Sequence, residues 1–262
     1  MFGWLIEVLR PFSFRGKVRL VERLAPREGM REATIHGNRL RLDLGDFIQR
    51  MIYLGCFEPW ETRVVRSVLR PGMTFLDVGA NVGYYSLLAA RRVGLAGKVF
   101  SVEPSPYAAD LFGDAIRLNG LSNVHLEVCG LGAASGEVQL SVPGRGNHTP
   151  SMLAIAGGGT ITVPVRRLDD CLDRWKCERI DLMKMDVEGY EGFVLDGASA
   201  AFAQGRIRRL LCEFNDFCLP LAGTSAERLY QRVLDLGFRD VTGTRRPPGS
   251  KLFNRCFELA ET

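Results

Sequence analysis

The feature that most constrains the fold is a regular alternation of short apolar segments with amphipathic segments along residues 74–236. The apolar segments are short and nearly continuous in hydrophobicity, which is typical of strands covered on both faces. Strands that alternate with helices form βαβ units, so we predict an α/β fold. The predicted strands are 74–79, 98–103, 123–129, 180–186 and 207–214, and the predicted helices are 82–93, 106–119, 168–175, 189–203 and 224–236.

Two parts of this region depart from the alternation. Residues 136–142 and 160–165 predict extra strands around a loop rich in Gly and Pro, which gives a β insertion at about 136–165. The last two predicted strands, 238–243 and 251–259, are joined by a linker short enough for a hairpin rather than a crossover. We therefore predict a seven-stranded, mostly parallel sheet whose last strand is antiparallel, with helices on both faces.

The N-terminal part of the chain, 1–70, follows a different pattern. Residues 1–30 favour helix interrupted by prolines, and residues 33–44 alternate polar and apolar around His36-Gly37-Asn38 as a hairpin does. Residues 46–69 have helical periodicity that is broken by Pro59. We predict two parts: a helical and hairpin preface at 1–70, which acts as a cap on the substrate side, and a sheet domain at 71–262.

Composition excludes some classes of protein. The net charge of +4 is spread along 262 residues without a dense basic stretch, so we expect no nucleic-acid partner. Seven scattered cysteines without metal-site spacing suit a reducing compartment, hence a cytoplasmic location. No apolar stretch is long enough to cross a bilayer. The N-terminal segment, with Trp4 and Phe12 near basic residues, is expected to pack on the domain, and contact with a membrane surface stays open as the alternative.

A glycine-containing turn, Asp77-Val78-Gly79-Ala80-Asn81-Val82-Gly83, follows the first apolar strand and opens a helix. Such a turn lets the backbone approach a ligand closely while helix N–H groups point at it. Asn81 stands where dinucleotide-binding turns have their middle glycine, which disfavours a pyrophosphate-binding dehydrogenase. Its amide could instead bind an amino-acid moiety. Tyr84 and Tyr85 begin the helix, and one of them is expected to reach the ligand.

An acidic residue ends the next strand. Glu103 follows the Gly79 turn by one helix and one strand, at the position where a carboxylate accepts hydrogen bonds from ribose hydroxyls, and Pro104-Ser105 comes after it. Cys129-Gly130-Leu131, at the end of the third strand, would lie on the same rim and flank an adenine. A solvated strand end for Glu103 and a buried thiol for Cys129 are the alternatives. The pattern predicts a nucleoside site at this edge of the sheet.

Several segments then resemble one family in order and spacing. They are FLDVGANVGYYS (75–86), VEPSP (102–106), LDD (168–170), MKMDVEGYE (183–191) and, upstream, YLGCFEPWE (53–61), in which Cys56-Phe57 departs from the expected pair. They resemble the FkbM family of methyltransferases. The resemblance implies a Rossmann-like class I methyltransferase domain, S-adenosylmethionine as cofactor with S-adenosylhomocysteine as product, and O-methylation as the usual reaction.

The predicted function is therefore S-adenosylmethionine-dependent O-methylation of a hydroxyl on a sugar, glycoconjugate or other natural product, with a small-molecule or glycan acceptor. A catalytically inactive cofactor-binding partner of a biosynthetic complex is the alternative. Oligomeric state is left open. The predicted cofactor-binding residues are Glu58, Asp77, Gly79, Ala80, Asn81, Gly83, Tyr84, Glu103, Pro104, Ser105, Cys129, Gly130, Leu131 and Asp186.

Methyl transfer to a hydroxyl benefits from a base that removes the proton. The candidates are Asp186, which ends an apolar strand at the ligand edge, with Glu188, Glu213 and the loop residue His148. Glu188 and Glu191 are expected to share a helix face, so a capping role is their alternative, and Lys184 is assigned a structural role. Oxygen ligands from Asp186, Glu213 and Asn215 could hold Mg²⁺, although we do not expect a metal requirement.

Overall fold

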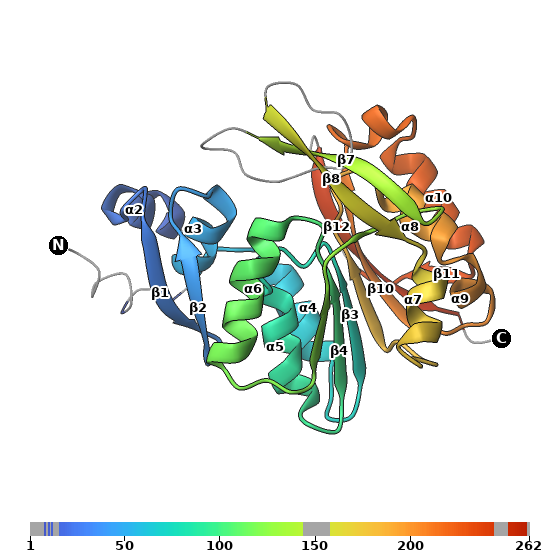
Figure 1. Cartoon of the computed structure of the whole chain (residues 1–262), viewed down its shortest axis with the longest axis horizontal. Helices are drawn as coiled ribbons and strands as arrows, with labels where there is room; N and C mark the ends of the chain where they lie inside the picture. The colour runs from blue at the N-terminus through green and yellow to red at the C-terminus, as the bar shows by residue number, and fades with distance from the viewer. Residues whose placement is uncertain are drawn as a thin grey trace.

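The computed structural model describes residues 16–143, 158–243 and 251–260, with the single residues 8, 10 and 12. A seven-stranded sheet in the order β11-β12-β10-β9-β3-β4-β5 forms its centre (Figure 1). Its strands are β3 (Thr74–Val78), β4 (Lys98–Val102), β5 (Val124–Glu127), β9 (Leu182–Met185), β10 (Arg209–Asn215), β11 (Phe238–Asp240) and β12 (Leu252–Leu259). All neighbours run parallel except β12, which is antiparallel to β10 and β11. The predicted sheet is confirmed.

The central strands are buried because both faces of the sheet carry helices. Successive side chains of β3 point to opposite faces, so Phe75 joins one core and Leu76 and Val78 join the other. One face carries α4 (Pro59–Val68), α5 (Tyr84–Val93) and α6 (Pro106–Leu118), and the other carries α7 (Leu168–Arg174), α8 (Glu191–Gly197), α9 (Ser199–Ala203) and α10 (Ala226–Asp235). This sandwich explains the apolar continuity of the strands.

The single helix predicted at 189–203 is wrong in two respects. It begins at Glu191, because Glu188 and Gly189 both have positive φ angles of 52° and 93°. It is also broken after Gly197 into α8 and α9. Gly197 packs so tightly that a Cβ there would lie 2.0 Å from the carbonyl oxygen of Gly132. The close approach of the two backbones, which no periodicity reveals, accompanies the break.

The N-terminal part contains α2 (Lys17–Leu24), β1 (Met30–Ile35), β2 (Asn38–Asp43) and α3 (Phe47–Tyr53). Strands β1 and β2 pair antiparallel. Between them, His36 and Gly37 have φ angles of 50° and 80°. Positive φ at both central residues is what a two-residue hairpin turn requires, and the predicted hairpin is confirmed. The side chain of Asn38 donates to the carbonyl of Leu87 at 3.0 Å and ties the hairpin to α5.

The predicted extra strands form a separate small sheet. Strand β8 (Gly158–Arg166) pairs antiparallel with β7 (Gly136–Pro143) and parallel with β6 (Gly130–Leu131). The predicted third strand, 123–129, therefore ends earlier, at Glu127, and the chain changes sheets at Gly130. Residues 144–157, with the candidate base His148, lie outside the described residues. A short 3₁₀ helix, η1 (Leu219–Ala222), follows β10.

The membrane predictions concern the start of the chain. Across the described residues, no helix combines the length and apolar character that a bilayer crossing needs. Trp4 lies outside the described residues, whereas Val8 and Phe12 are exposed. Contact of the N-terminal segment with a membrane surface stays a prediction.

The LDD segment has a structural role. Asp169, in the first turn of α7, is buried and accepts hydrogen bonds from the N–H groups of Ala200 and Ala201 at 3.1 and 2.9 Å. These N–H groups belong to the first turn of α9 and have no partner within that helix. Asp170, next to it, is exposed and accepts only from Ser135 at 3.3 Å. Asp169 therefore joins α7 to the broken helix.

We predict that Asp169→Ala destabilises the protein by about 2–4 kcal/mol, because the buried N–H of Ala201 and the partly buried N–H of Ala200 lose a charged acceptor. Asp170→Ala is the matched control and should change the free energy of unfolding by less than about 0.5 kcal/mol. Urea unfolding at constant m-value measures both. Equal losses for the two variants would show that Asp169 does not join the helices.

Candidate active site

A cavity opens at the carboxyl ends of β3, β4, β9 and β10, where open α/β sheets bind their ligands. It encloses about 1060 Å³, part of it open to solvent. Thirteen of the predicted site residues line it: Glu58, Gly79, Ala80, Asn81, Tyr84, Glu103, Pro104, Cys129, Gly130, Leu131, Asp186, Glu188 and Glu213. The sequence pattern therefore brings residues from distant segments to one place.

The turn after β3 forms one wall of the cavity. Gly79 has a φ of 82°, and a Cβ at this position would lie 1.9 Å from the carbonyl oxygen of Asp186. Only glycine allows β3 and β9 to approach so closely at their ends. The N–H groups of Gly79 and Ala80 both donate to the carbonyl of Val102 at 3.0 Å. The turn is therefore fixed from both neighbouring strands.

Glu103 is held rigidly beside this turn. One carboxylate oxygen accepts from the N–H of Asn81 at 2.7 Å and the other from the N–H of Ser105 at 2.8 Å. Burial raises the pKa of Glu103 to about 7, although the two N–H donors lower it. Each oxygen keeps a further lone pair for a ligand, and the residue lines the cavity. The arrangement suits a ligand that offers two hydroxyl donors.

An apolar wall faces Glu103. Cys129, Gly130 and Leu131 are buried and line the cavity, as predicted, and Leu140 of β7 joins them. Leu140 was not predicted as a site residue, because only the pairing of β7 with β8 brings the insertion beside the sheet edge. A flat apolar ring, such as a nucleobase, fits between such side chains.

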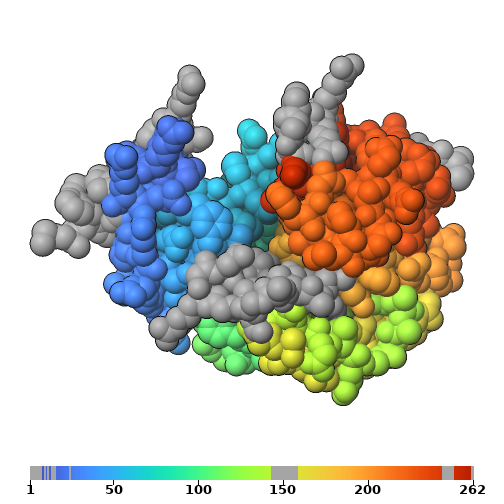
Figure 2. Space-filling view, turned by 90° about the horizontal axis from the view of Figure 1, so that it is seen from above, coloured from blue at the N-terminus to red at the C-terminus, as the bar shows by residue number. Residues whose placement is uncertain are grey.

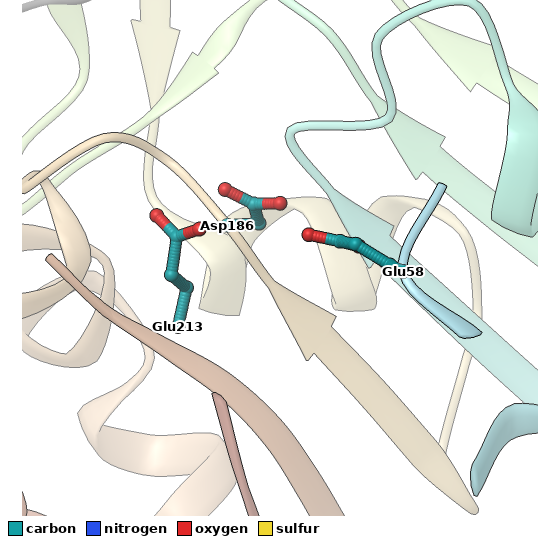
Figure 3. A group of neighbouring side chains, drawn as sticks. All are labelled: Glu58, Asp186 and Glu213. Atoms are coloured by element: carbon teal, nitrogen blue, oxygen red, sulfur yellow. The ribbon is translucent and has the colours of Figure 1, made fainter. Parts of the chain in front are cut away.

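Three carboxylates meet at the other end of the cavity. Glu58 precedes α4, Asp186 follows β9 and Glu213 lies in β10, and each places an oxygen within 4.8 Å of the other two (Figure 3). We call these residues the carboxylate cluster. Burial raises the pKa of Glu58 to about 7 and that of Glu213 well above its ordinary value, with further contributions from Asp186. The cluster therefore holds proton-binding groups that differ in pKa.

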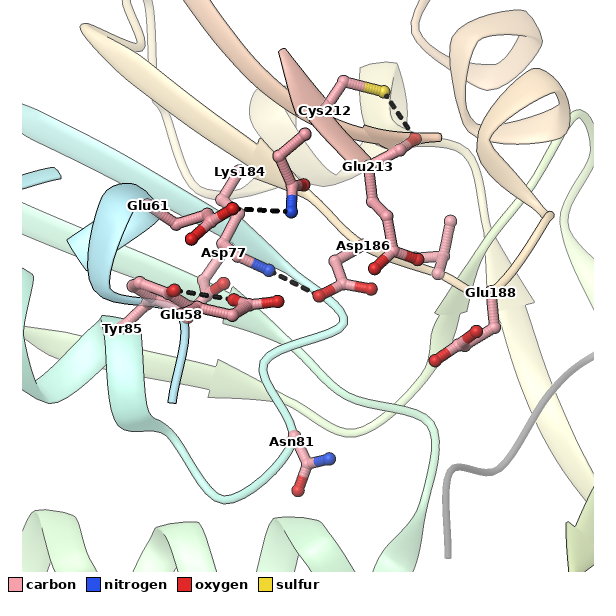
Figure 4. A network of polar contacts seen from close by, with 12 residues as sticks. Glu58, Glu61, Asp77, Asn81, Tyr85, Lys184, Asp186, Glu188, Cys212 and Glu213 are labelled. Carbon is pink, nitrogen blue, oxygen red and sulfur yellow. Dashed lines mark hydrogen bonds and ion pairs between the residues drawn. The ribbon is translucent and has the colours of Figure 1, made fainter. Parts of the chain in front are cut away.

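A buried lysine compensates this negative charge. The Nζ of Lys184 donates to Asp186 at 2.6 Å and lies 4.8 Å from the ring centroid of Tyr85 (Figure 4). Burial opposes the charge on Lys184, but Asp186, Glu58 and Asp77 outweigh it and raise its pKa. The Tyr85 hydroxyl in turn donates to Glu58 at 2.6 Å. Lys184 remains charged and fixes the position of Asp186.

Some predicted site residues do not line the cavity. Asp77 is buried beneath it and accepts from the Ser86 hydroxyl at 2.6 Å. Gly83 faces the ring of Phe112, where a Cβ would lie 2.1 Å from a ring carbon. Ser105 caps α6 by accepting from the Ala108 N–H at 3.4 Å. Their contribution to ligand binding, which stays a prediction, would act through the shape of the turn.

The acids after β9 also differ from expectation. Glu188 and Glu191 do not share a helix face, because Glu188 precedes the helix with a positive φ. Glu191 is fully buried and accepts from the N–H groups of Gly189 and Val187 at 3.2 and 3.4 Å. The Asn215 side chain donates to Glu188 at 2.9 Å, and its oxygen accepts from backbone N–H groups. Glu58, rather than Asn215, thus completes the group around Asp186.

Two cavity residues take roles that the sequence had left open. Lys184, assigned a structural role, lies two residues before Asp186 on one extended segment, so the two side chains point to the same face and pair. Tyr84 and Tyr85 were alternatives for reaching the ligand. Tyr85 contacts Glu58 from a different segment of the chain, which only the packing of α4 against α5 brings about.

Comparison with known proteins places the geometry in context. A family model described as the methyltransferase FkbM domain matches residues 77–239. Methyltransferase sdnD of Sordaria araneosa is 32% identical over 154 residues, which cover 47% of this chain and 59% of that protein. The chain thus spans less than two thirds of the length of sdnD. The 2-O-methyltransferase NoeI of Sinorhizobium fredii is 29% identical over 170 residues, which cover 59% of this chain and 68% of that protein.

Solved structures show a weaker likeness. A SAM dependent methyltransferase from Aquifex aeolicus is 17% identical with a TM-score of 0.45, and the match covers 76% of this chain and 88% of that one. A likeness with this TM-score supports no functional assignment. The family model, in contrast, matches more than half of the chain.

The buried acid Glu191 gives a prediction about pH. Burial raises its pKa to about 7, so between about pH 4.5 and 7 the folded protein holds a proton that the unfolded chain releases. The stability that this proton contributes is lost as pH rises through the window. We predict that Glu191→Gln gains up to about 3 kcal/mol relative to the parent between pH 5 and pH 8.

Unfolding by urea at each pH measures this difference. Glu178→Gln, at an exposed position, is the control and should follow the parent at every pH. A Glu191→Gln profile parallel to that of the parent would contradict the prediction.

Proposed function

Because this chain belongs to the FkbM methyltransferase family, we propose that it transfers a methyl group from S-adenosylmethionine to a hydroxyl of a sugar, glycoconjugate or other natural product. One observation carries the proposal: a single cavity contains the rigid carboxylate of Glu103 at one end and the carboxylate cluster at the other. The first suits a nucleoside and the second suits removal of a hydroxyl proton. The name of NoeI, a 2-O-methyltransferase, supports oxygen as the methyl acceptor.

The residues present fit S-adenosylmethionine. Glu103 would accept hydrogen bonds from the ribose hydroxyls, and the turn with Asn81 would hold the amino-acid part. The buried wall around Cys129 and Leu131 would flank the adenine. This division assigns a separate part of the cavity to each part of the cofactor. When bound, the cofactor supplies an electrophilic methyl group carried by a sulfonium.

The carboxylate cluster would position the acceptor and remove its proton. Asp186, held in place by Lys184, can accept a hydrogen bond from the acceptor hydroxyl and orient it. Glu58 has a pKa of about 7, which matches the task of a base near neutral pH. Burial, together with the nearby charges of Asp186 and Glu188, raises the pKa of Glu213 well above its ordinary value, which favours the form that can donate a hydrogen bond. We assign the base to Glu58; Glu188 and His148 stay candidates.

We propose that the reaction does not require a divalent metal. Asp186 already accepts from the ammonium of Lys184, and Glu58 already accepts from Tyr85. A cation placed among these carboxylates would be repelled by the buried positive charge of Lys184. The lysine therefore supplies the charge compensation that a metal would provide in another site.

We predict that the protein binds S-adenosylmethionine and S-adenosylhomocysteine, and that Glu103→Ala weakens binding about 100-fold or more, because two charge-assisted hydrogen bonds are lost. Affinity should also fall as pH drops below about 7, where Glu103 takes up a proton. Calorimetric titration measures both effects, and Glu137→Gln, exposed on β7, is the control.

Absence of binding by the parent protein would overturn the proposed function. Binding of the cofactor without turnover across a panel of hydroxyl acceptors would favour the inactive partner of a biosynthetic complex instead.

We predict that, with S-adenosylmethionine kept saturating at every pH, Glu58→Gln lowers the rate of methyl transfer by about 10²–10⁴-fold and removes the acidic limb of the pH profile. In the parent that limb should be centred near pH 7, with activity rising as Glu58 loses its proton. Glu61→Gln is the matched control, because Glu61 lies in the first turn of α4, outside the cavity lining, and accepts from Asn254. Its charge raises the pKa of Glu58, so in this variant the limb should remain and move to lower pH.

Transfer of labelled methyl groups to an acceptor found in the panel provides the measurement. Prior treatment with EDTA should leave rate and profile unchanged, which separates protonation from metal binding. A limb that persists in Glu58→Gln would assign the base to another residue.

A further inference from the structure

A second cavity lies beside the first, among α2, the β1–β2 hairpin and α4, and it contains about 2180 Å³ including space open to solvent. Five cationic residues line it: Arg10, Lys17, Arg19, Arg63 and Arg66. No Asp or Glu is found among the described residues of its lining. We call it the basic cavity. In Figure 2 the elements that form it lie on the blue to cyan side of the molecule.

The cations of the basic cavity fall into two groups. Lys17 donates to the carbonyls of Arg10 and Gly55 at 2.8 and 3.0 Å, and therefore joins these two residues. Arg63 and Arg66 are exposed, lie three residues apart on one face of α4, and form no ion pair within the described part of the chain. These two guanidinium groups are available to a ligand.

The positive charge of the basic cavity also acts on a histidine of its lining. His36, at the hairpin turn, lines the basic cavity, and burial together with the nearby charge of Arg66 lowers its pKa. Its ring contacts the hydroxyl of Tyr84 at 3.0 Å. The region thus carries positive charge that no acid of the described lining neutralises.

The two cavities share a wall. Ile52, Phe57 and Tyr84 line both of them. Glu58 lies immediately before α4, whereas Arg63 and Arg66 lie five and eight residues further on. At about 1.5 Å per residue the two arginines are about 8–12 Å from Glu58 along the helix axis. A monosaccharide that carries a phosphate could span this distance.

The charges of the two cavities would orient such a molecule. The arginines attract the anionic end of an acceptor into the basic cavity, which leaves its neutral hydroxyl to face the carboxylate cluster. Paired guanidinium groups match the geometry of phosphate oxygens. The geometry points to a phosphorylated acceptor: we propose that the basic cavity binds a phosphate group of the molecule whose hydroxyl is methylated. That the bound molecule is the methyl acceptor rests on the proposed function.

The test compares Arg63→Ala/Arg66→Ala with Arg31→Ala/Arg228→Ala, which removes the same charge at exposed positions outside the lining. The probes are inorganic pyrophosphate and glucose 1-phosphate, with glucose as the neutral comparison, titrated by calorimetry. The phosphorylated probes should bind the parent and the control variant alike. They should bind the Arg63 and Arg66 variant at least tenfold more weakly, and glucose should show no difference.

A second arm asks whether the phosphate is free or carried by a lipid. Vesicles of phosphatidylcholine with phosphatidic acid are sedimented with the same variants, against phosphatidylcholine alone. Binding that depends on Arg63 and Arg66 in either arm supports the basic cavity and identifies the source of the phosphate. Equal behaviour of the two double variants in both arms overturns the proposal.

Titration with S-adenosylhomocysteine separates this result from the proposed function. Both double variants should bind it as the parent does, because neither changes the lining of the first cavity. If the parent does not bind S-adenosylhomocysteine, the proposed function fails whatever the phosphate probes show.

Discussion

The buried ammonium of Lys184 is the interaction on which the arrangement of the site depends. Three acids, Asp77, Asp186 and Glu58, act on it from β3, from the end of β9 and from the start of α4. Desolvation raises the pKa of Glu58 and of Asp77, and the charge of Lys184 lowers both. A lysine in the central strand thus places a cation against the carboxylates of a buried sheet edge.

The same edge shows how packing and chemistry are coupled. Gly79 has no Cβ, so the turn after β3 can lie against the backbone carbonyl of Asp186. That contact sets the distance between the nucleoside end of the cavity and the carboxylate cluster. A larger residue at Gly79 would move Asp186 as well as close the turn. The position is therefore constrained by the neighbouring strand as much as by any ligand.

The sequence predicted the sheet and most of the cavity because both follow from short-range patterns. Apolar strands that end in Asp186 and Glu103 must place these acids at one edge of a parallel sheet. Contacts that depend on packing were not predictable in this way. The break between α8 and α9 depends on the backbone of Gly132, and the contact of Tyr85 with Glu58 depends on two helices packing together.

Glu58 lies in the N-terminal part of the chain and lines the same cavity as Asp186 and Glu213. Its φ of 36° is unusual for a residue other than glycine. Such a conformation costs about 1–3 kcal/mol, and it persists only where surrounding contacts hold it. Pro59, which begins α4, and the hydroxyl of Tyr85 provide these contacts. Glu58, one of the three residues of the carboxylate cluster, thus precedes the predicted domain boundary at residue 70. Because Arg63 and Arg66 lie on the helix that follows Glu58, any movement of α4 would shift the carboxylate and the two arginines together. Glu58 and the two arginines would then change position together when an acceptor binds.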